Sequence, residues 1–442
     1  MNTRHKQWMA GVATLTFPIE EGTPLAGYAA RSGASVGTLD VLFITALILQ
    51  ERNNRLVILS ADVAAVDVDL RREVSSAAGL KYEELAICAS HTHSGPAGVV
   101  ARLHPADSDR LDRELRSRFI LTAAEVIEAA RSGMTPVDLV FGSAETDGIS
   151  ANRNSPSRPN DPRLSVLATR RGDGSFQAVL VHFACHPTIL GADSLTVSAD
   201  FPGALRRNVS SSLTQASGAP VVLFVNGAAG DVSTRFTRRA QDAVEMERMG
   251  ASLANTTIEA LANAQVIDGP LRHSQASVSL SPRASTEGDH HDSVPQDLSE
   301  KAAHASSATA RIIETRNQGE AMLAALSALP EGAVPTLVEL DAWGIGDLVM
   351  VAIPGELIGS LEADIRSASA GTTLILGYTN GYVGYLADRP AHAESTYEAL
   401  ASPFGSETGE RLVDVSRALI RQLTSERNST HSAQEYDLTG PE

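Results

Sequence analysis

Cysteine is nearly absent from this 442-residue chain, which contains only Cys88 and Cys185. Two cysteines do not suggest a disulfide framework, so no oxidising compartment is required and we expect a cytoplasmic protein. Long apolar runs are also missing: no window approaches the roughly 20 consecutive apolar residues that a membrane-spanning helix needs. The first twenty residues likewise lack the unbroken apolar run of a signal peptide. The sequence therefore predicts a soluble protein without an export signal.

Positive charge and aromatic residues are scarce as well. Lys and Arg number 36 against 53 Asp and Glu, which gives a formal net charge of −17. Nucleic-acid grooves and anionic membrane surfaces are bound by clustered Lys and Arg, so we expect neither as the main partner. The charge balance favours a small, neutral or cationic partner. Aromatic residues make up 4% of the chain and form no cluster that suggests a deep slot for two long acyl tails.

What the sequence does contain is an alternation of short apolar runs and helical patterns, which is typical of an α/β layered fold. We predict strands at residues 41–49, 56–60, 85–89, 137–142, 164–169, 178–184 and 221–225. We predict helices at residues 69–78, 109–130, 201–213 and 302–329. Later in the chain, residues 336–343 and 348–353 are expected to form a hairpin that turns at 344–346. Leu412, Val415, Leu419 and Leu423 lie at the spacing of one helical face.

These patterns predict one large α/β domain over residues 1–424, with a mixed central sheet, surrounding helices and a functional site at strand ends. Residues 279–300 are polar and are expected to form a surface loop or insertion. Residues 425–442 show no apolar periodicity, and we expect a disordered tail. No feature of the sequence indicates an oligomeric state.

Two histidines directly follow one of the predicted strands. Residues 91–96 (HTHSGP) come after the strand at 85–89 and end in a glycine and a proline. Because side chains two apart on a strand share a face, we expect His91 and His93 to project together. Open α/β sheets bind ligands at the carboxyl ends of their strands. The pair therefore indicates a metal or substrate site, although loop histidines that bond only to backbone groups would give the same pattern.

A second predicted strand ends in the same way, in residues 182–188 (HFACHPT). Neutral imidazole is the commonest zinc ligand, and one histidine from each of two strand ends can build part of a site. His182 and His186 would lie about 13 Å apart at ~3.3 Å per residue, too far to bind one metal ion while extended. We favour His186, the nearer to the strand end, and interpret His182 as a core or rim residue.

Two further segments carry small residues and a carboxylate after apolar strands. Residues 224–233 (FVNGAAGDVS) contain a small-residue loop, which allows backbone N–H groups to approach a ligand closely. Residues 351–356 (VAIPGE) place Glu356 after a tight turn, at a predicted helix start. Taken singly, the first segment is also compatible with an ordinary turn, and the second with a glutamate that complements a helix dipole.

Together these four segments resemble the catalytic domain of neutral, non-lysosomal ceramidases, over residues 11–423. The matched pieces, in sequence order, are 27–29 (GYA), 91–96 (HTHSGP), 152–153 (NR), 183–188 (FACHPT), 198–200 (SAD), 230–233 (GDVS), 354–356 (PGE) and 380–385 (NGYVGY). Eight matches in one order are improbable by chance.

The resemblance implies one zinc ion per chain, bound by two histidines, a glutamate and a tyrosine. These positions map onto His91, His186, Glu356 and Tyr385, and Tyr382 is the competing tyrosine. Two imidazoles and a carboxylate with an open coordination position fit a catalytic zinc, which lowers the pKa of bound water to about 7.

The resemblance also implies roles for the neighbouring residues. His93 would act on the substrate carbonyl or carry protons, Arg153 and Tyr382 would contact the substrate, and Tyr385 could instead hydrogen-bond the oxyanion. Ser233 matches a serine considered catalytic in the family. Whether Ser233 attacks directly or only positions the substrate stays open at the level of sequence, because no nucleophile elbow is visible.

Asp200 has two interpretations of equal weight. It could orient a histidine that binds the metal, as carboxylates around metal sites commonly do. It could equally be the N-cap of the helix that is predicted to begin at Phe201.

The function that these residues predict is zinc-dependent hydrolysis of an amide bond by metal-activated water, with an N-acyl or other small-molecule amide as substrate. One alternative uses the same site on an ester, a lactone or a lipid amide. Another is a degenerate relative that binds a ligand without catalysis.

Overall fold

The fold is described here from a computed structural model, which covers residues 8–103, 110–284, 307–330 and 332–435. Its largest element is a nine-stranded sheet with the order β11-β9-β8-β6-β1-β3-β4-β5, in which β13 also pairs with β6. The β4/β5 and β9/β11 pairs are parallel and the others are antiparallel. The strands are β1 (Trp8–Thr16), β3 (Phe43–Glu51), β4 (Asn54–Ala61), β5 (Leu85–Ala89), β6 (Thr135–Glu145), β8 (Arg163–Arg170), β9 (Phe176–Phe183), β11 (Val221–Asn226) and β13 (Gln265–Ile267).

A second sheet of four strands packs on one face of the first. Its order is β14-β15-β16-β18, with β14 (Leu271–Ser279), β15 (Leu337–Ile345), β16 (Leu348–Ala352) and β18 (Thr372–Leu376). One core cluster joins Leu47 and Leu180 of the large sheet to Trp343 and Met350 of the small one. The sequence predicts a single central sheet. The second sheet is not distinguished from the first at that level, because strand patterns do not reveal which strands pair or what covers each face.

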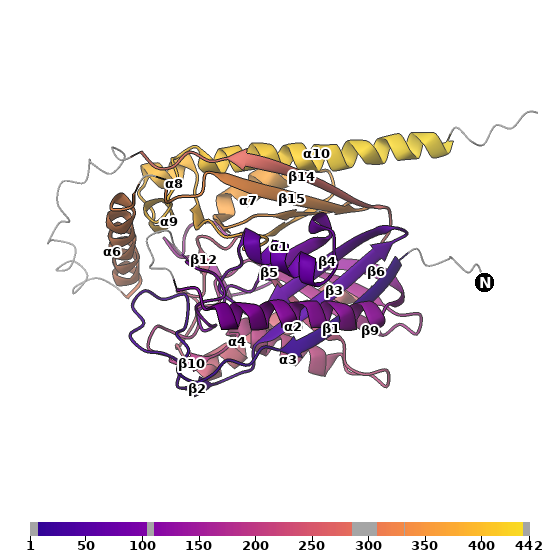
Figure 1. The fold of residues 1–442 in the computed structure, drawn as a ribbon, viewed down its shortest axis with the longest axis horizontal. Coiled ribbons are helices and arrows are strands. Elements are labelled where there is room, and N and C mark those ends of the chain that lie inside the picture. Colours follow the sequence, from indigo (N-terminus) through magenta and orange to yellow (C-terminus); the bar gives the residue numbers. More distant parts are fainter. Residues whose placement is uncertain (1–7, 104–109, 285–306, 331, 436–442) are drawn as a thin grey trace, which may run out of the picture.

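Helices cover the outer face of each sheet, so the domain has four layers (Figure 1). On the large sheet lie α1 (Val68–Ala77), α2 (Arg113–Ser132), α3 (Phe201–Ser212) and α4 (Ala243–Ala262). On the small sheet lie α7 (Gly359–Arg366) and α10 (Thr408–Glu435), and Figure 1 shows α10 running along β14 and β15. The predicted α/β class and mixed sheet are confirmed.

The shorter elements lie in the connections. They are β2 (Gly37–Thr38), β7 (Ala151–Asn152), β10 (Thr196–Val197), β12 (Val232–Ser233), β17 (Glu356–Leu357), β19 (Tyr385–Leu386), the 3-10 turn η1 (Tyr82–Glu84), α6 (Ser307–Ser327), α8 (Arg389–Ala393) and α9 (Tyr397–Leu400). The strands and helices predicted above are present, with ends that differ by a few residues. The exception is Glu356, which lies in the strand β17 and not at a helix start, because α7 begins only at Gly359. The elements β1, α4, β14 and β18 were not predicted.

Two predictions concern the polar segments. The helix α10 continues to Glu435, into the segment 425–442 for which the sequence predicts a disordered tail, and residues 436–442 lie outside the described part. Of the predicted insertion at 279–300, the first residue belongs to β14, and residues 285–300 are not described. Within the described helices, none is long and apolar enough to span a bilayer.

The carboxyl ends of β5, β9, β11, β16 and β18 meet at one end of the two sheets. Asn226, at the end of β11, donates hydrogen bonds to the carbonyls of Ser90 and Cys185. Gly377 donates its N–H to the Asn226 carbonyl, and Ala89 donates to the Tyr378 carbonyl. Thr379 donates its N–H to the Ile353 carbonyl after β16. The loops that follow these five strands are therefore fixed to one another, and five segments distant in sequence form one surface.

Candidate active site

His91 lies in the loop after β5, with a left-handed backbone (φ 65°) that turns its ring away from the strand path. Its Nδ1 is 2.6 Å from the Ala64 carbonyl, and its ring stacks on Tyr378 with centroids 4.0 Å apart. A carbonyl only accepts, so Nδ1 carries the proton and Nε2 presents a lone pair. This arrangement is the one in which histidine binds a metal.

His186 follows β9 and is held in the same way from the neighbouring loop. Its backbone N–H donates to the Val232 carbonyl, and its Nδ1 is 2.6 Å from the Ala229 carbonyl. Complete burial lowers the pKa of His186 to about 4. The imidazole is therefore neutral at physiological pH, and because Nδ1 donates to a carbonyl, the lone pair lies on Nε2.

Glu356 brings a carboxylate to the two imidazoles. Its Oε2 lies 2.9 Å from His186 Nε2 and 3.4 Å from His91 Nε2. Neither Oε2 nor His186 Nε2 makes a hydrogen bond of regular geometry to any described residue, although both are buried. Burial alone would raise the pKa of Glu356, but His91 and His186 hold it well below the usual range. Buried polar atoms that converge without hydrogen bonds indicate a shared ion.

His93 completes this cluster. Its Nε2 is 3.3 Å from His91 Nε2, and its ring contacts Tyr28 edge-on, with centroids 4.9 Å apart. Gly27 allows the approach, because a Cβ there would lie 2.4 Å from the His93 ring. Burial, followed by the other two histidines, lowers the pKa of His93 well below its ordinary value. The ligating nitrogens of all three histidines lie within 4.8 Å of one another.

The donor set therefore fits a metal ion, with two imidazoles and one carboxylate converging on a point and a third imidazole adjacent. Nitrogen and oxygen donors of this kind suit zinc. The two tyrosines differ. Tyr382 donates its hydroxyl proton to Glu356 Oε1, while the Tyr385 ring lies beside Arg153 and packs on Tyr397. The structure thus brings the competing tyrosine, Tyr382, against the carboxylate.

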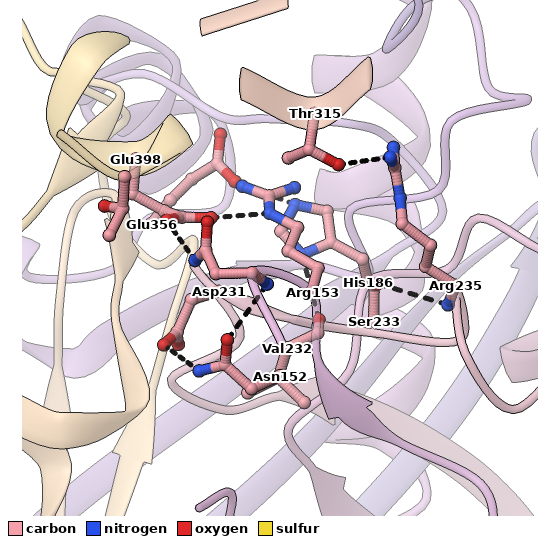
Figure 2. A network of polar contacts seen from close by, with 12 residues as sticks. Asn152, Arg153, His186, Asp231, Val232, Ser233, Arg235, Thr315, Glu356 and Glu398 are labelled. Carbon is pink, nitrogen blue, oxygen red and sulfur yellow. Dashed lines mark hydrogen bonds and ion pairs between the residues drawn. The ribbon is translucent and has the colours of Figure 1, made fainter. Parts of the chain in front are cut away.

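Arg153 reaches the cluster from the loop after β7 (Figure 2). Its Nε donates to Glu398 over 2.6 Å, and its guanidinium lies over the Tyr397 ring. Its Nη2 is buried and has no hydrogen-bond partner in the described part of the chain. Burial alone would lower its pKa, but Tyr385 and Glu398 raise it well above its ordinary value, so Arg153 stays charged.

Asp231 holds this loop in place. Its carboxylate accepts hydrogen bonds from Asn152 Nδ2 at 2.6 Å and from the Gly359 N–H at 2.7 Å, and its carbonyl accepts from the Arg153 N–H (Figure 2). Gly230 next to it cannot carry a side chain, since a Cβ would lie 2.6 Å from the Glu356 carbonyl oxygen. The small-residue loop predicted from sequence therefore serves to pack the Glu356 segment against the Arg153 loop.

Ser233 and Asp200 lie in different surroundings. Ser233 pairs with His186 through the backbone, and its Oγ accepts a hydrogen bond from the Arg235 N–H. Across the described residues, no histidine or carboxylate is hydrogen-bonded to that Oγ. The Asp200 carboxylate accepts from the N–H groups of Phe201 and Leu190 and so caps α3. Of the two interpretations of Asp200, the structure shows the helix cap.

Most of these groups line one cavity of about 870 Å³, whereas His186, Asp231 and Asp200 lie outside its lining. His91, His93 and Glu356 lie in its wall together with Arg153 and Ser233, and both Tyr382 and Tyr385 line it. His182 does not line the cavity. Its Nε2 bonds to the Ile375 carbonyl within the sheet core, as predicted for a core residue. The cavity can hold a small organic substrate beside the histidine cluster.

Some contributing residues were not predicted. Tyr378 stacks on His91, Asn226 joins the loops, and Glu398 pairs with Arg153. Tyr378 lies only two residues before the NGYVGY piece and Asn226 begins the small-residue loop, so both lie next to recognised segments. Nothing in the local sequence marks Glu398.

A family model supplies the decisive comparison. The model for the neutral/alkaline non-lysosomal ceramidase N-terminal domain matches residues 9–281. The chain belongs to this family. The resemblance derived from the sequence is therefore confirmed, and the family's amide-hydrolase chemistry gives a frame for the cluster of His91, His186 and Glu356.

Solved structures agree in fold. A neutral ceramidase from Pseudomonas aeruginosa matches with a TM-score of 0.75 at 18% identity, over 95% of this chain and 75% of that one. A ceramidase complexed with C2 matches with a TM-score of 0.76 at 17% identity, over 95% of this chain and 76% of that one. The TM-scores show that the architecture is shared. Because the identity is this low, the substrate has to be inferred from the residues of this chain.

Proposed function

We propose that this chain is a zinc-dependent hydrolase that cleaves a linear amide bond. The observation that carries the proposal is the buried convergence of His91 Nε2, His186 Nε2 and Glu356 Oε2 in a member of the ceramidase family. His186 Nε2 and Glu356 Oε2 approach to 2.9 Å without a regular hydrogen bond. The two histidines are held by backbone carbonyls, so the site is preorganised.

His91, His186 and Glu356 would hold the zinc ion, with His93 in reach of the same point. When bound, zinc lowers the pKa of a water molecule to about 7 and polarises a carbonyl oxygen. Tyr382 fixes Glu356 through its hydroxyl, so that Oε2 remains the free carboxylate oxygen. We assign Tyr385, for which the resemblance implies a ligand role, to substrate contact instead; the support is its ring, which lies beside Arg153 in the cavity wall.

The remaining side chains handle the proton and the developing charge. Neutral His93 is available to accept a proton at Nε2 and return it to the leaving nitrogen, as general acid–base catalysis requires. The free Nη2 of Arg153 is a charged donor that can stabilise an oxyanion. Ser233 has no base among the described residues, so we assign it a positioning role and not that of a nucleophile.

The substrate we propose is an N-acyl amide that fits a cavity of about 870 Å³. Ceramide itself, a lipid amide, is the second candidate, since the family is described as ceramidases. The cytoplasmic location predicted from sequence remains part of the proposal.

The test is hydrolysis of matched amides and esters by purified protein, before and after treatment with a zinc chelator. We expect cleavage of the amide, loss of activity after chelation and recovery with added zinc. Amide cleavage that resists the chelator would contradict the proposed zinc dependence. Cleavage of the ester alone would contradict the amidase assignment.

A further inference from the structure

The outer part of the cavity is lined by arginines, in contrast to the acidic chain as a whole. The net charge of the protein is −17, yet Arg31, Arg235, Arg238 and Arg311 all line this one space. The carboxylates in the lining are Asp193, Glu314 and the buried Glu356. Positive groups concentrated in a concave site raise the local concentration of anions.

Arg31 is the clearest member because part of its guanidinium lacks a partner. Its Nη1 donates to the Ala26 carbonyl over 2.7 Å. Its Nε and Nη2 are buried and have no hydrogen-bond partner among the residues that the structure describes. A buried charged donor without a partner costs free energy unless a ligand supplies the acceptor.

Arg235 and Arg238 bond only to neutral groups. Arg235 Nη1 donates to the Thr315 hydroxyl and the Arg311 carbonyl, while Arg238 Nη1 donates to the Thr188 carbonyl over 3.2 Å. Within the described ranges, neither has a carboxylate within 4.0 Å. Burial, with repulsion from other arginines, lowers the pKa of both groups. Glu314 offsets part of this shift for Arg235, and Tyr28 and Asp200 do so for Arg238, but no carboxylate of the described residues pairs directly with either guanidinium.

Tyr28 connects these arginines to the histidine cluster. The Arg31 guanidinium lies 5.0 Å from the centroid of the Tyr28 ring, and the same ring contacts His93 edge-on. Arg31, Arg235 and Arg238 line the same cavity as Tyr28 and His93. Burial raises the pKa of the Tyr28 hydroxyl, and the positive charges of these three arginines oppose that rise. The arginines and His93 therefore face one space, which a small substrate can occupy.

We propose that Arg31, Arg235 and Arg238 form an anion-binding subsite, and that the preferred substrate is an N-acyl amide bearing a carboxylate or a similar anionic group. This inference rests on the proposed amidase function and refines its substrate class. Arginine suits the task because its planar donors match carboxylate geometry. It also revises the expectation of a neutral or cationic partner, which followed from net charge alone.

The test compares amides of equal length that differ in charge. N-octanoylglycine places a carboxylate on the amine side of the bond, and its glycinamide counterpart is the neutral match. The mono-N-methylamide of octanedioic acid places the carboxylate on the acyl side, with N-methyloctanamide as its neutral match. For one of the two pairs we expect kcat/KM to favour the anionic member at least tenfold, with a preference that weakens at high salt.

Variants locate the effect. Arg31→Gln and Arg238→Gln should each lower the anionic-to-neutral ratio of kcat/KM about tenfold, mainly through KM, because each removes a charged hydrogen bond. Arg421→Gln removes the same charge from the exposed side of α10 and should leave the ratio unchanged. Calorimetry measures the binding affinity of the metal-loaded His93→Ala variant for N-octanoylglycine and for the mono-N-methylamide of octanedioic acid. This measurement does not need turnover.

The outcomes separate the two proposals. If both neutral amides are cleaved as well as the anionic ones, the subsite is wrong and the amidase stands. If no amide is cleaved, the amidase fails, and calorimetry alone judges the subsite. The subsite is supported if an anionic amide binds and this binding weakens in the Arg31→Gln background. The subsite is overturned if no such binding is found.

Discussion

Two buried histidines four residues apart show how different the sheet interior and its edge are. His182, within β9, bonds through Nε2 to the Ile375 carbonyl at 2.8 Å, whereas His186, just past the strand, keeps Nε2 free beside Glu356. Burial lowers the pKa of each to about 4. Burial and pKa therefore do not distinguish a structural histidine from a functional one. The difference lies in which ring atom has found a protein partner.

The largest expected effect is on catalysis. His186→Ala should lower kcat/KM for the cleaved amide by at least about 10³-fold, because it removes a group proposed to hold the catalytic ion. His182→Gln, the matched change within the sheet, should retain most of the activity. Steady-state kinetics of both variants checks this, and equal losses in the two would contradict the contrast between them.

The next effect concerns stability at acidic pH. Unfolded His182 takes up a proton below pH 6.5, but the folded residue does so only near pH 4. The unfolded state therefore gains protons first, and stability falls between those pH values by about 3 kcal/mol from this residue. His182→Gln keeps a donor toward Ile375 and should flatten the pH dependence by that amount. Urea unfolding from pH 7 to pH 4 measures it; identical slopes for both proteins would refute it.

A smaller effect distinguishes the two tyrosines. Tyr382→Phe removes the hydrogen bond to Glu356 and should weaken zinc affinity about 10- to 100-fold. Tyr385→Phe should change it little, because this ring lies beside Arg153 and Tyr397. Competition with a fluorescent zinc chelator gives both values. The reverse order would restore Tyr385 as the ligand that the sequence resemblance implies.

The smallest effect tests Asp200. Asp200→Ala removes the cap of α3 and should reduce the free energy of unfolding by about 1–2 kcal/mol, with zinc affinity unchanged. Asp200→Asn, which can still cap, serves as the control. A drop in zinc affinity in Asp200→Ala without loss of stability would revive the alternative in which Asp200 orients a histidine.

The sequence predicted the site better than the arrangement around it. His91, His93, His186 and Glu356 each follow an apolar strand, and such strand ends are legible because glycine or proline stops the run. Most strands and helices of the main sheet were predicted to within a few residues for the same reason, although β1 and α4 were not. In the second sheet β15 and β16 were predicted as a hairpin, but β14 and β18 were not, because tertiary packing sets their partners.

Long-range pairing was equally hidden from the sequence. Glu398, 245 residues after Arg153 in the chain, forms an ion pair with that guanidinium, and no local sequence pattern marks Glu398. Net charge averages over the whole surface, so it does not reveal that Arg31 and Arg238 line one cavity, to which only the fold brings them.

The most direct test of the account is metal analysis of the purified protein by inductively coupled plasma mass spectrometry, with His186→Ala measured beside it. We predict about one zinc ion per chain in the wild type and little in the variant. Stoichiometric zinc in both, or none in a wild-type protein that still cleaves the amide, would contradict the claim that His91, His186 and Glu356 form the catalytic metal site.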